Sequence, residues 1–494
     1  MSPNTMPTRE AIVDGARPCD SARIAQRSWA VVPLRERLGV LRKVRALAAN
    51  CAEELAESSG GTRGRSSAEV LTAEVLPWLD AIRFLENNAE RLLAPKRLGS
   101  RHRPLWLSRV STSIYREPVG VTLIIAPGNY PLLLGGVQTV QALAAGNAVL
   151  FKPAAGCSAV ANRLSELFGA AGLPENLFVV LGESVQEAES AIEQKVDKII
   201  LTGSAKTGHA VLRRAAETLT PVVAELSGCD AVLIRDDADL DLAARALHFG
   251  LELNSSATCI APRRVFVARR IAERFEARLA QDLATRPTFP AKPEVAARLL
   301  PLIEDALAGG ATLLSSMSDS AAVTLPVVIA GARTDAALLW EEVFAPVLTL
   351  VVFDNDDEAI ELINRCPYAL GATVFSRDLK AALSLASRIQ AGVVSINDMI
   401  APTADPRVPF GGRRRSGFGV TRGAEGLLEM TAVKVVTVTS GTSRPHFQTP
   451  KPDQAQLFAG YIRAAHANRL VDRWAGLTRL WNAALSLRKK DSSS

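Results

Sequence analysis

Several short apolar segments between residues 121 and 226 end in side chains that could do chemistry or bind a nucleotide. They carry Asn129 after VTLIIAPG, Lys152 after AVLF, Gly203 and Ser204 after KIILT, and Glu225 in PVVAEL. Further along, Cys259 lies in the turn-like NSSATCIAP. A thiolate attacks carbonyl carbons, amide donors stabilise the resulting oxyanion, and a carboxylate can activate water. These residue types indicate cysteine chemistry on a carbonyl compound.

The elements that position these side chains follow from a repeated strand and helix pattern. The predicted strands are VTLIIA, AVLF, LFVVL, KIILT and PVVAEL, and the predicted helices between them cover residues 133–145, 159–172, 185–194 and 206–218. This alternation predicts a parallel sheet covered by helices on both faces. Because ligands bind beyond the carboxyl ends of such strands, we expect the four strand-end sites to gather there.

The rest of the chain divides into three kinds of segment. Apolar residues at helical spacing predict helices within 34–57 and 68–93, with SSGGTRGRSS as a loop between them. A second α/β stretch runs from about 230 to 422 and contains the strand-like RRVFVA, LTLVVF, ATVFS and GVVSI. A polar, Pro-containing linker, SGTSRPHFQTPKPDQ, leads to the carboxyl-terminal tail.

Composition excludes several classes of protein. With 494 residues, 48% hydrophobic and 22% charged, the chain is typical of a soluble globular protein with more than one domain. Its six cysteines and five histidines are too scattered for a metal site, so no metal is expected. The amino terminus has no apolar secretory core, which predicts a reduced, cytoplasmic protein. Residues 118–151 carry no charge, but Pro, Gly, Asn and Gln interrupt them too often for a membrane span.

Seven segments in order, from about Tyr115 to Lys434, resemble the aldehyde dehydrogenase superfamily, most nearly its shorter, dimeric fatty and aromatic aldehyde dehydrogenases. They are APGNYP, FKP, LTGS, AELSG, NSSATCIAP, EEVFAPVL and PFGGRRRSGFG. The resemblance implies an α/β fold in which a parallel-sheet cofactor domain joins an α/β catalytic domain and a bridging β segment. The implied boundaries are 1–226 for the NAD(P)-binding domain with its amino-terminal helices, 227–420 for the catalytic domain, 421–445 for a return segment that joins a bridging strand near 106–118, and 446–494 for the linker and tail.

The resemblance also implies roles for three residues. Cys259 would attack the aldehyde, and the Asn129 amide with the Cys259 backbone N–H would stabilise the oxyanion. Glu225 would activate water to hydrolyse the thioester that remains on the cysteine. The implied activity is NAD(P)-dependent oxidation of an aldehyde to its acid, and a long-chain or lipidic aldehyde is a candidate substrate.

Cofactor binding is implied at five further positions. Gly203 and Ser204 would open a helix whose free N–H groups suit a pyrophosphate. Lys152 would contact the adenosine ribose, Glu342 the nicotinamide ribose, and Phe344 would pack near the ring. Related NAD-preferring enzymes often have a carboxylate three residues after the lysine, where this chain has Ala155. Without that charge a 2′-phosphate is less repelled, so NADP is expected to be tolerated as well as NAD.

Departures from the family pattern leave other functions open. Ser227 and Ser256 replace usual glycines, and Ala257 replaces a usual glutamine, which predicts a reshaped pocket because glycine alone has no Cβ. An NAD(P)H-dependent acyl-thioester reductase is one alternative, although Glu225 argues against it because that reaction must avoid hydrolysis. A catalytically weak, cofactor-binding scaffold is the other.

The tail suggests further partners. From Leu457 onward it has seven Lys or Arg residues and two Asp residues, so it carries most of the net charge of +6. Apolar residues between Leu470 and Leu485 follow a helical stripe, which suits an anionic membrane surface or, alternatively, the protein's own body or a second subunit. A homodimer or homotetramer is expected, because two-stranded arms such as the bridging segment need a partner. The basic residues fit no nucleic-acid-binding motif.

Overall fold

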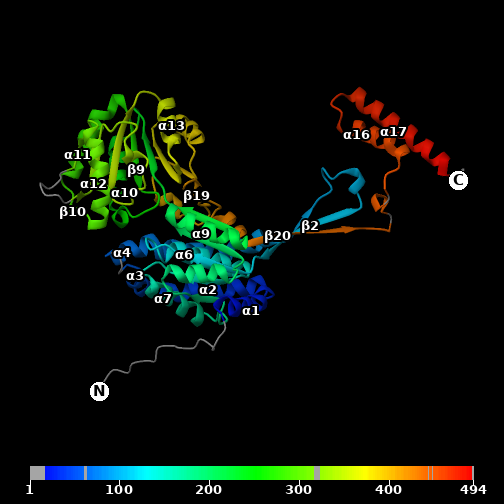
Figure 1. Cartoon of the computed structure of the whole chain (residues 1–494), viewed down its shortest axis with the longest axis horizontal. Coiled ribbons are helices and arrows are strands. Elements are labelled where there is room, and N and C mark those ends of the chain that lie inside the picture. Colours follow the sequence, from blue (N-terminus) through cyan, green and yellow to red (C-terminus); the bar gives the residue numbers. More distant parts are fainter. Residues whose placement is uncertain (1–16, 61–63, 316–322, 443, 448, 492–494) are drawn as a thin grey trace, which may run out of the picture. The chain divides into compact units, whose positions relative to one another are not determined.

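The computed structural model describes residues 17–60, 64–315, 323–442, 444–447 and 449–491 (Figure 1). The chain divides into two compact units, one of residues up to 96 with 114–435 and the other of 97–113 with the residues from 436 onward. The sequence predicts no apolar secretory core at the amino terminus. Residues 1–16, which carry most of that segment, lie outside the described residues. No described helix is both long and apolar enough to cross a membrane.

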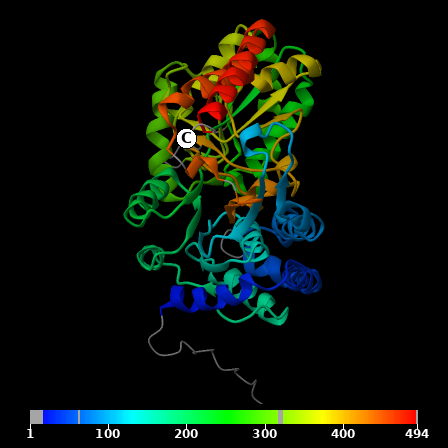
Figure 2. The same cartoon turned by 90° about the vertical axis from the view of Figure 1, so that its right-hand side faces the viewer.

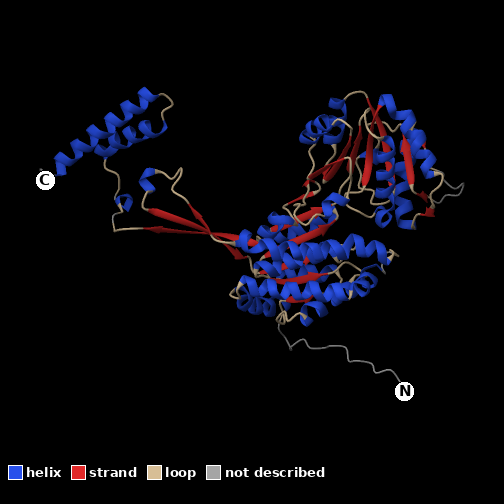
Figure 3. Cartoon of the chain, turned by 180° about the vertical axis from the view of Figure 1, so that it is seen from behind, coloured by secondary structure: helices blue, strands red, loops and turns tan. Residues whose placement is uncertain are grey.

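The predicted parallel sheet is present in the larger unit, and helices lie on both of its faces (Figure 3). Its strands lie in the order β19-β7-β6-β3-β4-β5, and all except β19 are parallel. The strands are β3 (Val121–Ile125), β4 (Ala148–Lys152), β5 (Phe178–Val180), β6 (Lys198–Gly203), β7 (Val222–Leu226) and β19 (Gly417–Phe418). The helices between them are α6 (Leu133–Ala145), α7 (Ser158–Ala170), α8 (Val185–Glu193) and α9 (Ala205–Thr218).

The uncharged stretch 118–151 forms the centre of this sheet, as expected, and does not span a membrane. β3 is buried along its whole length because it pairs with β4 on one side and β6 on the other. α6 is buried on every face, which explains its lack of charge. Gly146 ends α6 with a φ of 99°, a left-handed conformation that favours glycine.

A second, seven-stranded sheet follows in the order β11-β13-β14-β9-β8-β16-β17 (Figure 2). Its strands are β8 (Asp230–Ile234), β9 (Pro262–Ala268), β11 (Thr312–Leu313), β13 (Val327–Ala330), β14 (Val347–Phe353), β16 (Gly371–Phe375) and β17 (Val393–Ile396). Its helices are α10 (Leu240–Glu252), α11 (Ala272–Leu283), α12 (Pro293–Ala308), α13 (Asp356–Arg365) and α14 (Leu379–Arg388). The four predicted strands of this stretch are confirmed. Each sheet has its own buried apolar core.

The amino-terminal helices differ from the prediction in detail. They are α1 (Pro18–Ala30), α2 (Leu34–Asn50), α3 (Ala52–Gly60), α4 (Ser67–Val70) and α5 (Leu76–Leu93), with a π-helical turn at Leu71–Val75. The expected single helix over 34–57 breaks at Cys51, whose φ of −122° and ψ of 32° are not helical. α3 then continues into the predicted loop as far as Gly60.

A third sheet contains the predicted bridging strand, and the tail belongs to the smaller unit. β1 (Lys96–Leu98), β2 (Val110–Pro118) and β20 (Thr431–Thr439) form a three-stranded sheet in that order. β20 thus lies next to β2 in this sheet. The tail forms two helices rather than one, α16 (Ala455–His466) and α17 (Leu470–Asp491) (Figure 1). They pack closely at Gly460 and Gly476, where an added Cβ would clash with the backbone of the opposite helix.

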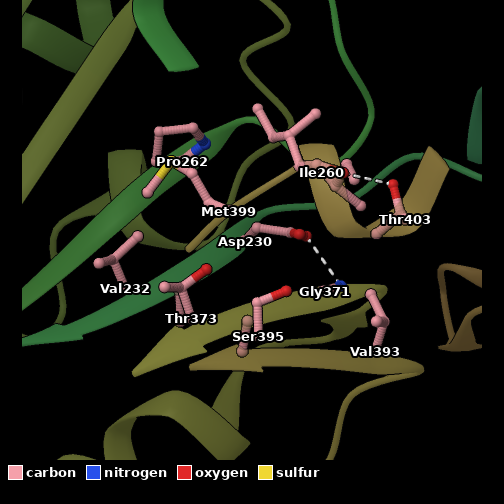
Figure 4. Close-up of a pocket in the computed structure, with 13 residues that line it drawn as sticks. Asp230, Val232, Ile260, Pro262, Gly371, Thr373, Val393, Ser395, Met399 and Thr403 are labelled. Carbon is pink, nitrogen blue, oxygen red and sulfur yellow. Dashed lines mark hydrogen bonds between the residues drawn. The ribbon is translucent and has the colours of Figure 1, made fainter. Parts of the chain in front are cut away.

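The buried carboxylate of Asp230 lies where the chain enters the second sheet (Figure 4). Its Oδ1 atom accepts a hydrogen bond from the Gly371 backbone N–H at 3.1 Å, beside a cavity of about 20 Å³. Burial raises the pKa of Asp230 to about 7, although Gly371 and the guanidinium groups of Arg264 and Arg263 oppose that rise. The carboxylate therefore costs stability whenever it is ionised.

Replacing Asp230 with Asn should change how stability depends on pH. An unfolded Asp titrates near pH 4, so between about pH 4 and 7 the folded wild type binds more protons and its unfolding free energy falls as pH rises. Relative to Asp230→Asn, the wild type should lose about 2 to 3 kcal/mol between pH 5 and pH 8. Urea unfolding of both proteins at the two pH values measures this difference. A difference that did not change with pH would contradict the assigned pKa.

Candidate active site

One cavity of about 780 Å³ in the larger unit is bordered by every residue that the sequence singled out. They are Asn129, Lys152, Gly203, Ser204, Glu225, Cys259, Glu342 and Phe344. Five of them lie at or just beyond the carboxyl ends of β3, β4, β6 and β7, as parallel strands require. The structure thus brings together residues that are up to 215 positions apart in the chain.

The loop that carries Cys259 has an unusual backbone. Asn254, Ser255 and Ser256 all have positive φ angles, of 50°, 49° and 58°. Non-glycine residues rarely adopt this region, and such strain persists only where surrounding groups hold it in place. The buried guanidinium of Arg263 does so, because it donates hydrogen bonds to the Ser256 carbonyl (2.6 Å), the Ser256 hydroxyl (2.7 Å) and the Ala345 carbonyl (2.9 Å).

Sequence reasoning missed Arg263. The only available signal was that the predicted strand RRVFVA begins with two arginines although the rest of it is apolar. Burial lowers the pKa of Arg263 to about 10, so the group is still a cation at neutral pH. The Ser256 hydroxyl, which replaces a hydrogen of the usual glycine, both accepts from Arg263 and donates to the Gly250 carbonyl at 3.0 Å. Ser256 therefore adds contacts to the loop.

The Cys259 thiol borders both this cavity and a second one. Burial, together with the negative charges of Glu225 and Asp230, raises its pKa to about 12, although the positive charge of Arg422 opposes the rise. The thiol of the free protein is therefore protonated at neutral pH. A nearby base is needed before the sulfur can act as a nucleophile.

The Glu225 carboxylate is a candidate for this base. It is buried, and burial raises its pKa, whereas Arg422, Thr421 and Thr202 lower it. The Thr421 hydroxyl donates to Oε1 of Glu225, and the Thr202 hydroxyl donates to Oε2 at 3.3 Å. Gln138 in turn donates to Thr202 at 3.0 Å. This hydrogen-bond network holds the carboxylate at the end of β7.

Asn129 connects the loop after β3 to the cysteine loop. Its Nδ2 atom donates to the Ala257 carbonyl at 3.1 Å, and Asn254 donates to the Asn129 carbonyl at 2.8 Å. On the other side of the cysteine loop, Gly228 approaches so closely that an added Cβ would lie 2.5 Å from the Cys259 carbonyl oxygen. Only glycine fits at this position. The segment that connects β7 to β8 therefore packs closely against the cysteine loop and also fixes the position of the thiol.

The opposite part of the cavity has the donors and acceptors that a dinucleotide needs. α9 begins just after Gly203, and the Ser204 hydroxyl caps it by accepting from the Thr207 N–H at 3.2 Å. Free N–H groups at such a helix start suit a pyrophosphate. Among the residues that the structure describes, neither the Lys152 ammonium nor the Glu342 carboxylate has an ion-pair partner within 4 Å, so both can bond to hydroxyl groups. This donor set fits NAD or NADP.

The second cavity has a different character and a volume of about 300 Å³. Its lining is mostly apolar and includes Leu133, Leu134, Phe249, Leu253, Ile260 and Ile400. Cys259 lies where the two cavities meet. The thiol can therefore face an apolar compound on one side and a nucleotide on the other.

A model of the aldehyde dehydrogenase family matches residues 9–436, so the chain belongs to that family. The 4,4'-diapolycopene aldehyde oxidase of Methylomonas sp is 32% identical over 420 residues, which cover 83% of this chain and 79% of the relative. The 58 residues after 436 lie outside the family match.

Two solved structures share the fold. Betaine aldehyde dehydrogenase from Staphylococcus aureus, in complex with NAD+, is 26% identical with a TM-score of 0.80 and covers 88% of this chain and 89% of that one. The NADP-dependent glyceraldehyde-3-phosphate dehydrogenase from Bacillus halodurans C-125, complexed with NADP, is 30% identical with a TM-score of 0.79, covering 85% and 90%. The protein is accordingly an oxidoreductase that oxidises an aldehyde with NAD or NADP.

The choice between the two cofactors can be tested at Ala155, which borders the cavity. A carboxylate there would repel a 2′-phosphate, so Ala155→Glu should raise the ratio of NAD to NADP efficiency at least about tenfold. Ala155→Gln, of similar size but uncharged, is the matched control and should change the ratio much less. Steady-state kcat/KM values with both cofactors measure the effect. If wild type prefers NAD more than about a thousandfold, the predicted tolerance of NADP is wrong.

Proposed function

We propose that this chain oxidises apolar aldehydes through a thiohemiacetal and a thioester on Cys259. The observation that carries the proposal is the position of Cys259, where the smaller, mostly apolar cavity meets the larger cavity that Asn129 and Glu225 also border. In this arrangement the aldehyde enters from the apolar side. Its carbonyl carbon then reaches the sulfur at the junction.

The first step is attack of the sulfur on the carbonyl. The buried thiol must lose its proton, and Glu225 is the base that can accept it, because the two groups interact and both have raised pKa values. The Asn129 amide and the Cys259 backbone N–H stabilise the oxyanion of the thiohemiacetal. A bound nicotinamide cofactor supplies the acceptor for the hydride that leaves this carbon.

Glu225 then acts on water. Its carboxylate is held by Thr202 and Thr421 and borders the cavity, so it can take a proton from a water molecule that attacks the thioester. The products are the free acid and the thiol. A buried carboxylate at this place favours hydrolysis and argues against acyl-thioester reduction.

Cofactor binding is proposed for the opposite side of the cavity. The N–H groups at the start of α9, after Gly203 and Ser204, would hold the pyrophosphate. Lys152 would bond to the adenosine ribose and Glu342 to the nicotinamide ribose, with Phe344 beside the ring. All of these residues border the cavity, which supports the assignment.

We also propose that the protein is a homo-oligomer. β20 is exposed along most of its length, and its valines at 433, 435, 436 and 438 are exposed to solvent. An apolar strand of this kind invites pairing with another chain, and a second copy is the simplest partner.

We propose that the protein is cytoplasmic and that its tail contacts membranes. On α17 the side chains of Leu470, Val471, Trp474, Leu477, Trp481 and Leu485 are exposed, whereas Gly476, on the opposite side of the helix, packs against α16. Arg469, Arg473 and Arg479 add positive charge, which favours an anionic lipid surface as the partner of this apolar face.

The roles of Cys259 and Glu225 can be separated by two variants. Cys259→Ser should lose at least about 1,000-fold of the aldehyde-dependent reduction of NAD or NADP, because the nucleophile is removed. Glu225→Gln should lose about 100-fold or more in both the burst rate and the steady rate of cofactor reduction, because Glu225 takes the proton of the thiol before attack and that of water during hydrolysis. Stopped-flow absorbance at 340 nm follows both phases. If Glu225→Gln kept the burst rate of the wild type, Glu225 would be needed only for hydrolysis, and its assigned role in attack would be wrong.

The membrane proposal predicts vesicle binding that depends on the two exposed tryptophans. Trp474→Ser with Trp481→Ser should reduce co-sedimentation with phosphatidylserine vesicles at least about fivefold, because the apolar face is lost. Asn482→Ser, also exposed on α17, is the control and should bind like wild type. Unchanged binding in the double variant would overturn the proposal. So would a change in oligomer mass, measured by light scattering, without any vesicle binding.

A further inference from the structure

The apolar cavity beside Cys259 contains one unexpected cation. Among the described residues that line it, Arg422 is the only one with a charged side chain. Its guanidinium lies 4.7 Å from the centre of the Phe410 ring and donates to the Thr403 carbonyl at 2.8 Å. It has no ion-pair partner within 4 Å among the described residues. The charge of Arg422 therefore acts on whatever occupies the cavity.

The backbone of Arg422 is strained. Its φ of 61° and ψ of 173° fall in a region that is occupied almost only by glycine. A glycine at this position would relieve the strain but would remove the side chain. An arginine with strained backbone angles that borders the cavity points to a role for its guanidinium there.

The aromatic rings of the cavity are already used by cations. A quaternary ammonium ligand is normally held by the faces of several aromatic rings. Here the guanidinium of Arg65 lies 5.4 Å from the centre of the Tyr130 ring, and Arg422 covers Phe410. Tyr130 offers no negative charge either, because burial raises its pKa to about 12. Of the aromatic residues in the lining, only Phe249 then remains.

Negative charge is also missing from the lining. Glu225 feels the charge of Arg422, but it borders the larger cavity and is not among the residues that line the apolar one. Glu74, a buried carboxylate in the helical layer, is ion-paired with Arg65 and accepts hydrogen bonds from the N–H groups of Leu132 and Leu133. A cationic substrate would thus meet a like charge with no compensating partner.

We infer that the cavity selects aldehydes with an uncharged apolar body and that Arg422 excludes cationic ones. The inference deepens the proposed function and rests on it, because it concerns the substrate of the same thiol. It separates this chain from the structural neighbour named for betaine aldehyde, a compound with a cationic trimethylammonium group. An anionic body is also disfavoured, because a single cation that already bonds to Thr403 and stacks on Phe410 does not repay the desolvation of a carboxylate.

Two aldehydes of nearly the same shape test the inference. Betaine aldehyde carries a trimethylammonium group, and 3,3-dimethylbutanal carries a tert-butyl group in the same place. Wild type should have a kcat/KM at least about 100-fold higher for 3,3-dimethylbutanal. Arg422→Met should lower this ratio at least about tenfold, whereas Arg422→Lys, which keeps the charge, should keep it within about threefold of wild type. The hydration of each aldehyde and the effect of Arg422 on the thiol pKa cancel when ratios are compared between variants.

The outcomes are distinguishable. Equal ratios in wild type and Arg422→Met would overturn the role of Arg422. Efficient use of betaine aldehyde by wild type, or a preference for 4-oxobutanoate over pentanal, would overturn selection for uncharged bodies, although aldehyde oxidation itself would stand. If no aldehyde of the panel, including decanal, led to cofactor reduction in wild type, the proposed function would fail rather than the inference about selectivity. Binding of 3,3-dimethylbutanal to Cys259→Ser, measured by calorimetry, gives a readout that does not depend on turnover.

Discussion

The geometry of the site depends on the hydrogen bonds that the buried guanidinium of Arg263 donates. Three successive residues with left-handed backbone angles precede Cys259, and each would relax toward ordinary angles if it were free. Arg263 prevents this by holding both polar groups of Ser256 and the Ala345 carbonyl at once. Burying the charged guanidinium of Arg263 costs free energy, but these hydrogen bonds offset that cost. They also hold the loop that carries the sulfur in place.

The charged groups around Cys259 have opposing effects on its pKa, and not all of them favour the thiolate. Burial and two carboxylates, Glu225 and Asp230, raise the pKa of Cys259, whereas Arg422 and the Ile260 N–H lower it. A protonated thiol is less exposed to oxidation, because oxidants react with the thiolate. Burial also raises the pKa of Glu225, which makes its carboxylate a stronger base than one exposed to solvent.

Much of the fold could be predicted from the sequence, and so could the gathering of the candidate residues around one cavity, because both depend on local patterns. Short buried strands that alternate with helices define a parallel sheet, and its carboxyl ends must meet, so Asn129, Glu225 and Ser204 had to gather at one edge. The interactions that hold them could not be predicted in the same way. Arg263 and Thr421 act through contacts with residues seven and 196 positions away, and no periodicity records such pairs. The break at Cys51 and the two-helix tail also depend on tertiary packing rather than on local preference.

The two cavities that meet at Cys259 differ in a way that bears on catalysis. A nucleotide needs many polar partners, and an apolar substrate needs their absence, so one undivided pocket could not serve both well. The cysteine loop separates the two environments and presents the sulfur to each. In the smaller, apolar cavity the charge of Arg422 does not disturb binding of an uncharged chain, because such a chain loses no hydrogen bonds to water when it enters. A charged chain would lose its hydration there, and so a single arginine can decide selectivity without touching the reacting atoms.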